Sequence, residues 1–519
     1  MKARYAILIS VLLAGCNVGP KYVAPSVPPP PAFKEALPSA YSGALLGAWQ
    51  PARPQDAVLK GKWWESFNEP ELNALEEQLN IDNQNIAQYF QNFMAARAQV
   101  SEARAGFYPT VTANPAANIG GTAAKSTTTN ATSASLASGG TTGTTTASTT
   151  TTTSGGTVTG GVALPFDVSW EPDLWGRVRN TVREAQYAAQ VSAADLENER
   201  LTEQANLAEY YFELRGQDAL QNLNNRIVEA DKTLLTITRS LVETGIYPPA
   251  AIPQAEVTLD SAESSQIGIA TNRAIYEHAI ATLIGKPASS FSMPVKALVT
   301  PIPAIPVGVP SELLQRRPDI AAAERTMAEA NALIGVEKAA FYPTLNLTGA
   351  GGLEASSFKA LFALPAVFWS LGASASQIIF DAGLRKATVA QYTALYNADV
   401  ASYKETILTA FQQVEDYIAT VRVTSQQIDR ADAAIKASQT YVQMETGRYE
   451  TGLDPYLDVI TAQLTLLGSQ QAQVTLHVNE MTAAVELIQA LGGGWKASEL
   501  PEPSKIRSDA AVRQVQETP

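Results

Sequence analysis

Two copies of one sequence pattern occur in this chain, and the repetition constrains the fold more than any other feature. The tetrapeptide FYPT ends at Thr110 and again at Thr344, and the 28 residues that end at each copy align without a gap. Further along, DLWGR from Asp173 resembles DAGLR from Asp381. Self-similarity at a fixed spacing indicates one structural unit used twice, so we predict an internal tandem duplication.

The first copy carries 26 residues more than the second, because the offset between the copies falls from 234 residues at FYPT to 208 at DLWGR. A tract rich in Thr, Gly and Ser at residues 120–157 accounts for the difference. Such a tract has too little apolar surface to offset the entropy lost on ordering. We therefore expect an enlarged, mobile loop, on the extracellular side if the flanking segments cross a membrane.

Each copy contains two segments in which apolar and polar residues alternate, as they do in half-buried strands. We predict strands at about 107–119, 158–170, 341–353 and 367–380. Tilted strands of this length can cross an outer membrane, and aromatic residues gather at their ends as they do at membrane interfaces. A soluble sheet with one solvated face is the alternative interpretation.

Two long segments without proline follow the strands, from Arg177 to Glu243 and from Arg385 to Glu450. As helices, each would reach roughly 100 Å at 1.5 Å per residue. Apolar residues from Val389 to Val421 recur at a period between that of a coiled-coil seam and that of a straight helix. This pattern favours a wall of helices around water, with an ordinary antiparallel coiled coil as the alternative.

Four strands per chain cannot cross a membrane alone, because the two sheet edges would leave backbone groups unpaired in hydrocarbon. Two chains would close a barrel of about 8 strands, whose interior fills with side chains, whereas three chains would give about 12 strands and leave a lumen. We therefore predict a mixed α and β membrane protein that is a homo-oligomeric barrel continued by long helices.

The single cysteine, Cys16, ends a segment with the features of a bacterial lipoprotein signal. A positively charged start is followed by an apolar stretch at residues 5–13 that is too short to span a bilayer. LLAGC resembles a lipobox, which makes residues 1–15 a signal peptide and Cys16 the lipidated N-terminus. In bacterial lipoproteins an Asp after the cysteine usually retains the protein in the inner membrane, and this chain has Asn17 there, so the resemblance points to the outer membrane. Residues 16–61 would then form the lipidated N-terminal tether, with the Pro-rich stretch VAPSVPPPPAF, and an equatorial segment. An ordinary signal peptide with an incidental cysteine is the alternative.

The composition argues against nucleic-acid binding and against enzymatic chemistry. A net charge of −13 offers nothing to neutralise phosphates. The two histidines stand in no ligand or triad spacing, and no nucleophile–base pair, metal cluster or phosphate loop is visible. We expect no cofactor and no metal, and we interpret Asp173 and Asp381 as caps of the helices that follow them.

Five stretches together resemble the TolC-like outer-membrane factor family, in its lipoprotein (OprM/NodT-like) branch. They are CNVGPKYVAP, KWWESFNEPELNALEEQ, VSWEPDLWGRVR, PSELLQRRPDIAAAE and LGGGW, and the resemblance covers nearly the whole chain. It implies a homotrimer with a twelve-stranded outer-membrane β-barrel, four strands per chain, a long periplasmic α-helical barrel and an equatorial domain. Residues 62–286 and 317–494 would be the two repeats, 287–316 the equatorial crossover and 495–519 a C-terminal tail.

The resemblance also implies a function. Such a protein is the exit duct of a tripartite efflux pump and passively conducts drugs or other toxic small molecules from the periplasm to the outside. Its partners would be a periplasmic adaptor protein, an inner-membrane transporter of the resistance-nodulation-division type, and outer-membrane lipid. A type I protein-secretion duct shares the fold, and a non-channel outer-membrane lipoprotein scaffold is a further alternative.

Members of this family constrict the duct where the second long helix turns back, at TGLDPYLDVITAQL in this chain. Position by position, their hydrophobic ring falls on Leu457 and their usual acid on Thr461, whereas their basic positions fall on Glu450 and Leu464. The chain therefore departs from the charged lock that the resemblance implies.

Spacing of one helical turn places Asp454, Leu457 and Thr461 on one face. We expect Leu457 to form the constriction, Asp454 the nearest acidic ring and Asp458 a flank of it. Capping of the returning helix is the alternative role for Asp454. The first turn, around Tyr247, is the alternative place for the narrowest point.

Overall fold

The structure, a computed structural model, describes residues 17–26, 28–37, 61–122, 157–296, 302–303, 305, 310–356, 359–360, 366–502 and 505–506. Cys16 and most of the Thr-rich tract, residues 123–156, lie outside these ranges. The chain divides into two compact units. Residues 104–178 and 338–385, with the N-terminal segment to Val18, form a sheet unit, and the remainder forms a helical unit.

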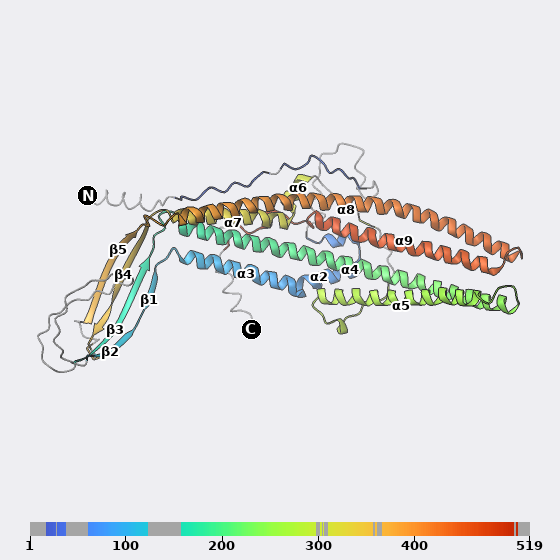
Figure 1. Ribbon diagram of the computed structural model, residues 1–519, viewed down its shortest axis with the longest axis horizontal. Coiled ribbons are helices and arrows are strands. Elements are labelled where there is room, and N and C mark those ends of the chain that lie inside the picture. The colour runs from blue at the N-terminus through green and yellow to red at the C-terminus, as the bar shows by residue number, and fades with distance from the viewer. Residues whose placement is uncertain are drawn as a thin grey trace. The chain divides into compact units, whose positions relative to one another are not determined.

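The sheet unit is antiparallel throughout (Figure 1). Its strands are β1 (Thr110–Ala113), β2 (Ala116–Thr122), β3 (Thr157–Trp170), β4 (Thr344–Ala355) and β5 (Val367–Ser376), in the order β1-β3-β4-β5 with β2 also paired to β3. The single strand expected at 107–119 is thus two short strands in one row beside β3. Proline breaks the row, because Pro115 has no N–H to donate to the ladder.

Strand register gives the sheet two chemically different faces. Val111 pairs with Val168, Val168 with Gly349, and Gly349 with Leu371, so one row crosses the whole sheet. Because successive residues of a strand point to opposite faces, the registers assign every other row to the same face. The apolar face carries Val111, Ala113, Leu164, Phe166, Val168, Leu347, Leu353, Trp369 and Leu371, and the other face carries Thr110, Thr112, Asp167, Ser169, Asn346, Thr348, Ser370 and Ser374.

Long helices run through the remainder of the chain. They are α2 (Pro70–Asp82), α3 (Gln84–Ala105), α4 (Arg177–Glu243), α5 (Ala251–Leu283), α6 (Pro310–Arg316), α7 (Pro318–Ala339), α8 (Leu384–Glu450) and α9 (Tyr456–Ala490), with short 3₁₀ turns η2 (Trp63–Phe67), η3 (Ala288–Ser290) and η5 (Ala497–Glu499). α4 and α8 have 67 residues each. α4 has the bounds expected from the sequence, and α8 begins one residue earlier than expected.

The largest apolar core of the helical unit joins η2, α2, α4, α8 and α9. The stripe predicted from the periodicity of α8 is buried at Ile407, Val414 and Val421, and its Val414 and Ile418 belong to this core. Burial of an aliphatic side chain of this size stabilises a fold by about 1.5–3 kcal/mol. No described helix contains a segment long and apolar enough to span a membrane.

The N-terminal segment is docked rather than free. The Tyr22 hydroxyl donates to Glu324 Oε1 at 2.5 Å. Further along, Glu35 pairs with Arg422 at 2.5 Å, and Glu415 accepts the backbone N–H groups of residues 34 and 35. The described residues of the expected tether therefore bind α7 through Tyr22 and α8 through residues 34 and 35.

Part of the expected C-terminal tail also packs into the helical unit. Trp495 and Ile506 are buried, with 8% and 2% of their surfaces exposed. The Pro501 carbonyl accepts a hydrogen bond from Gln190 Nε2 of α4 at 2.8 Å. Residues 495–502 and 505–506 are therefore part of the folded unit.

Candidate functional site

The two helix-to-helix turns, which the sequence singles out as candidate gates, have the same backbone geometry. Gly245 ends α4 with a φ of +75° and Gly452 ends α8 with a φ of +74°. The next residue in each turn donates its N–H back across five residues, from Ile246 to Leu241 and from Leu453 to Arg448, each at 2.9 Å. This is the Schellman arrangement, for which glycine is the residue of lowest strain.

At the second turn Arg448 forms a salt bridge with Asp454. Arg448 Nε donates to one carboxylate oxygen of Asp454, and Nη2 donates to the other at 2.9 Å. The hydrogen bond from Arg448 holds the pKa of the Asp454 carboxyl below its usual range. Asp454 is not the N-cap of α9, because Pro455 occupies that position without a side-chain cap bond. The capping role considered for Asp454 is therefore wrong.

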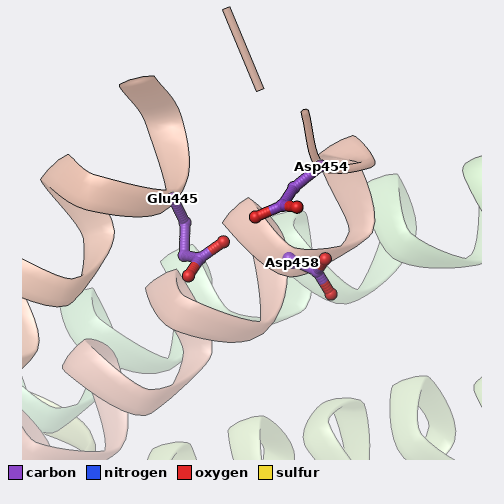
Figure 2. Close-up of side chains that lie close together, drawn as sticks. All are labelled: Glu445, Asp454 and Asp458. Carbon is purple, nitrogen blue, oxygen red and sulfur yellow. The ribbon is translucent and has the colours of Figure 1, made fainter. Parts of the chain in front are cut away.

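Two further acids lie beside this pair (Figure 2). Glu445 on α8, Asp454 in the turn and Asp458 in the first turn of α9 each have a carboxylate oxygen within 4.8 Å of the others. Desolvation, followed by the charge of Asp454, raises the pKa of Glu445. Both oxygens of Asp454 are engaged by Arg448, so the group is an ion-pair network with a surplus of acid.

Leu457 and Thr461 occupy neighbouring turns of the same face of α9. Leu457 is half-buried and Thr461 is exposed. The Thr461 hydroxyl donates to the Leu457 carbonyl at 2.9 Å, so the helix backbone satisfies it. The structure thus brings together Asp454 and Asp458 with Glu445 and Arg448. Leu457 lies between the two aspartates in the first turn of α9, and Thr461 lies one turn further along the helix.

Arg448 and Glu445 are the two residues of this network that the sequence analysis missed. The sequence did contain a signal for Arg448, because a glycine that ends a helix turns the chain back within a few residues. Arg448 precedes Gly452 by four residues and Asp454 follows it by two, so the turn brings their side chains to one side. The basic residue that pairs with Asp454 is Arg448, before the turn. It is at neither of the two positions, Glu450 and Leu464, where the family resemblance predicts a basic residue.

The residues that follow Cys16 lie in the sheet unit, against an aromatic pair. Val18 donates its N–H to the Trp175 carbonyl at 3.3 Å. The Trp175 ring stacks on Tyr342 with centroids 4.8 Å apart, and its Nε1 donates to the Pro343 carbonyl at 2.7 Å. Val18 therefore lies beside the half-buried Trp175 and the exposed Tyr342, two residue types that are common at membrane interfaces.

Asp173 and Asp381 serve as the helix caps that the sequence predicts. Asp173 Oδ1 accepts the N–H of Val178 at 3.3 Å, in the first turn of α4. Asp381 accepts the N–H groups of Gly383 and Arg385 at 3.0 and 3.3 Å, at the start of α8. Each carboxylate satisfies a backbone donor that a helix start leaves without a partner.

The two FYPT copies make matching contacts. The Phe107 carbonyl accepts a hydrogen bond from Trp170 Nε1, and the Phe341 carbonyl accepts one from Gln377 Nε2, both at 3.0 Å. The tetrapeptide therefore ends a helix and starts a strand in both places, and a side chain at the end of the returning strand closes each copy.

Matching contacts also occur where α5 and α9 end. Gly285 has a φ of +69°, and a Cβ there would lie 2.5 Å from the Asp82 carbonyl oxygen. Gly492 has a φ of +91°, and a Cβ there would lie 2.1 Å from the Arg316 carbonyl oxygen. In each half, a helix thus ends on a glycine that permits close approach to the segment before α3 or α7.

Comparisons with known proteins agree with this architecture. The profile of the outer membrane efflux protein family matches residues 75–286 and 309–493. The antibiotic efflux pump outer membrane protein ArpC of Pseudomonas putida is 28% identical over 488 residues, which cover 93% of this chain and 94% of ArpC. Outer membrane protein OprJ of Pseudomonas aeruginosa is 27% identical over 495 residues, with coverage of 94% and 95%.

Solved structures show the same fold. The outer-membrane channel OprN superimposes with a TM-score of 0.76 at 26% identity, over 92% of this chain and 100% of that chain. The CmeC outer membrane channel of Campylobacter jejuni gives a TM-score of 0.78 at 21% identity, over 97% of this chain and 98% of that chain.

Proposed function

The chain belongs to the outer membrane efflux protein family, and from that premise we propose that it is the exit duct of a tripartite efflux pump. It conducts small toxic molecules passively from the periplasm to the outside. A periplasmic adaptor protein and an inner-membrane transporter of the resistance-nodulation-division type load it. Relatives named for the efflux of antibiotics and toluene support organic compounds as its cargo.

The single observation that carries this proposal is the two-faced sheet. Four antiparallel passes present one apolar face and one face on which most residues are Ser, Thr, Asn or Asp, in register from β1 to β5. Trp369 and Leu371 on the apolar face are 76% and 82% exposed in the single chain, which suits contact with lipid. The polar face suits a water-filled lumen.

Closure of this sheet requires further copies. The strand order leaves β1 with β2 at one edge and β5 at the other, among the residues that the structure describes. Backbone groups at those edges must pair before the sheet can lie in hydrocarbon. Three copies supply about 12 strands and leave a lumen, so we propose a homotrimer with a twelve-stranded barrel. The Thr-rich loop then faces the cell exterior.

The helices continue the duct as a periplasmic α-helical barrel. α4 and α8 have equal lengths, and the FYPT contacts, the turns at Gly245 and Gly452, and the helix ends at Gly285 and Gly492 recur in both halves. These paired contacts support a tandem duplication. The core around η2 and α2, with the crossover at 287–316, would form the equatorial domain.

The duct is closed at the α8–α9 turn. Leu457 forms the constriction, with Thr461 one turn further along, while Asp454 and Asp458 set the charge of the entrance. The two hydrogen bonds from Arg448 to Asp454 support this assignment, because they link the end of α8 to the turn just before Leu457.

Cys16 carries the lipid anchor in the outer membrane. The hydrogen bond from Val18 to the Trp175 carbonyl supports this role, because Val18 is two residues from Cys16 in the sequence and Trp175 stacks on Tyr342. Each buried CH₂ of an acyl chain contributes about 0.8 kcal/mol to membrane binding, so two or three chains would hold the protein there durably.

Two measurements on the full-length protein test the proposed duct. Purified protein in planar bilayers should conduct ions without an energy source. Deletion of the gene should raise accumulation of a fluorescent efflux dye, and the intact gene should reverse it. Absence of conductance together with unchanged dye accumulation contradicts the proposal. Loss of an exported protein with unchanged dye accumulation would identify a secretion duct instead.

A further inference from the structure

One carboxyl group lies in the apolar stripe of α2. The helix buries Leu72, Leu75 and Leu79 together with Glu76, at the spacing of a single helix face. Glu76 is 0% exposed, like Leu72 and Leu79. Its neighbour Glu77 points to solvent and pairs with Lys62. A glutamate therefore occupies a position that the pattern of α2 assigns to an apolar side chain.

Neither carboxyl oxygen of Glu76 has a hydrogen-bond partner in the part of the chain that the structure describes. Several charged side chains that contact α2 or its flanking residues have partners other than Glu76. They are Lys62 with Glu77, Lys286 with Gln78, Lys296 with Glu69, Arg215 with Glu71 and Asp218, and Glu203 with Asn83 and Asn85. Burial alone acts on Glu76, and it raises the pKa of this carboxyl well above its ordinary value.

Isolated carboxylates are far too costly to bury without a partner, so the enclosed form of Glu76 is the neutral acid. Among the residues that the structure describes, Trp64 Nε1 in the core cluster shared by α2 and η2 also has no hydrogen-bond acceptor.

We propose that Glu76 is a proton-dependent latch for α2. In its neutral form it docks α2 on the core. When it releases its proton to water, the carboxylate must become hydrated, which loosens α2 and the η2 turn that packs on it. The helical unit would thus hold α2 most firmly in acid and release it progressively as the surrounding pH rises.

Hydrogen–deuterium exchange on the detergent-solubilised full-length protein tests the latch. Protection of the peptide that covers α2 should fall with rising pH, by about tenfold per pH unit once opening is coupled to release of one proton. Rates are corrected for the intrinsic pH dependence of exchange. Glu76→Gln and Glu76→Leu should remove this extra pH dependence, because neither side chain ionises. Glu77→Gln on the same helix is the matched control and should keep it.

A wild-type profile without extra pH dependence in α2 overturns the latch. So does a Glu76→Gln variant whose profile matches the wild type. If the Leu variant does not assemble, the Gln variant and the wild-type profile still decide the question. The duct proposal is unaffected by either result, because channel conductance is measured separately.

Discussion

Arg448 and Asp454 clasp the α8–α9 turn through two hydrogen bonds, one from Nε and one from Nη2 of the guanidinium to the two carboxylate oxygens. The clasp joins the last turn of α8 to the residue before Pro455. Glu445 and Asp458 lie beside Asp454, without a second arginine or lysine in the cluster among the described residues. This cluster therefore contains one cation and three acids, and the exposed Glu450 at the end of α8 adds a further negative charge nearby.

Removal of that cation should make the channel more selective for cations. Arg448→Ala should raise the cation-to-anion permeability ratio in planar bilayers, because three acids then lack a basic neighbour. Asp454→Asn should lower the ratio. Arg448→Lys keeps the charge but not the paired hydrogen bonds, so it should stay near the wild-type ratio. A ratio unchanged in both Arg448→Ala and Asp454→Asn would place the charged entrance elsewhere.

Shortening the proposed constriction should open the resting channel. Leu457→Ala removes the half-buried apolar side chain that we assign to the narrowest point, so resting conductance should rise clearly above that of the wild type. Leu453→Ala is the matched control, because Leu453 lies in the same turn and is 71% exposed. Equal conductance of wild type and Leu457→Ala would move the constriction, most simply to the first turn around Tyr247.

Glycine is required at the end of α9. Gly492→Ala adds a Cβ at a φ of +91° and only 2.1 Å from the Arg316 carbonyl oxygen. Backbone strain of this kind costs about 1–3 kcal/mol, so the unfolding midpoint should fall. Gly468→Ala, inside α9, meets no atom within 4 Å and should stabilise the fold by about 0.5–1 kcal/mol. The idea fails if the two variants unfold at the same temperature.

Stability of the helical unit should fall between acid and neutral pH. Burial, followed by the charges of Glu486 and Glu213, raises the pKa of Glu209 from 4.5 to about 7. The folded chain keeps this proton where the unfolded chain loses it. The stabilisation is therefore complete below about pH 4.5 and is lost as the pH rises to about 7. Burial, with the charges of Glu184 and Asp399, also raises the pKa of Glu329 to about 7.

Thermal unfolding of the helical signal at about pH 5 and about pH 8 measures this dependence. The difference between the two midpoints should shrink in Glu209→Gln and in Glu329→Gln. Glu229→Gln, at an exposed position of α4, should leave the difference unchanged. Midpoints that rise with pH in the wild type would reverse the expected sign and contradict the assignment.

Lipidation should depend on one residue. Cys16→Ala should abolish incorporation of labelled palmitate, while the wild type should take it up and fractionate with the outer membrane. The sheet could still insert, so location of the variant does not decide the question. Labelling that persists in the Ala variant, or a wild type found in the inner-membrane fraction, would show that the anchor is not at Cys16.

The sequence alone determines the elements that depend on local periodicity. The buried stripe of α8 and the two faces of the sheet follow from spacing, because a helix repeats near every fourth residue and a strand repeats every second. The bounds of α4 follow from a long segment without proline, the residue that breaks a helix. The FYPT repeat likewise predicts the matching helix-to-strand transitions. Asp173 and Asp381 cap their helices as expected, since a cap needs only its immediate neighbours.

Tertiary structure decided what depends on residues far apart in the chain. The docking of Glu35 on Arg422 and the burial of Ile506 require surfaces that no local pattern describes. The burial of Glu76 also depends on distant residues. The sequence of α2 alone would predict a solvent-exposed glutamate there, and only the packing of the other helices buries it. The Arg448–Asp454 pair combines local and tertiary features. The turn that joins them is local, but only the folded backbone shows that the basic partner of the turn precedes it.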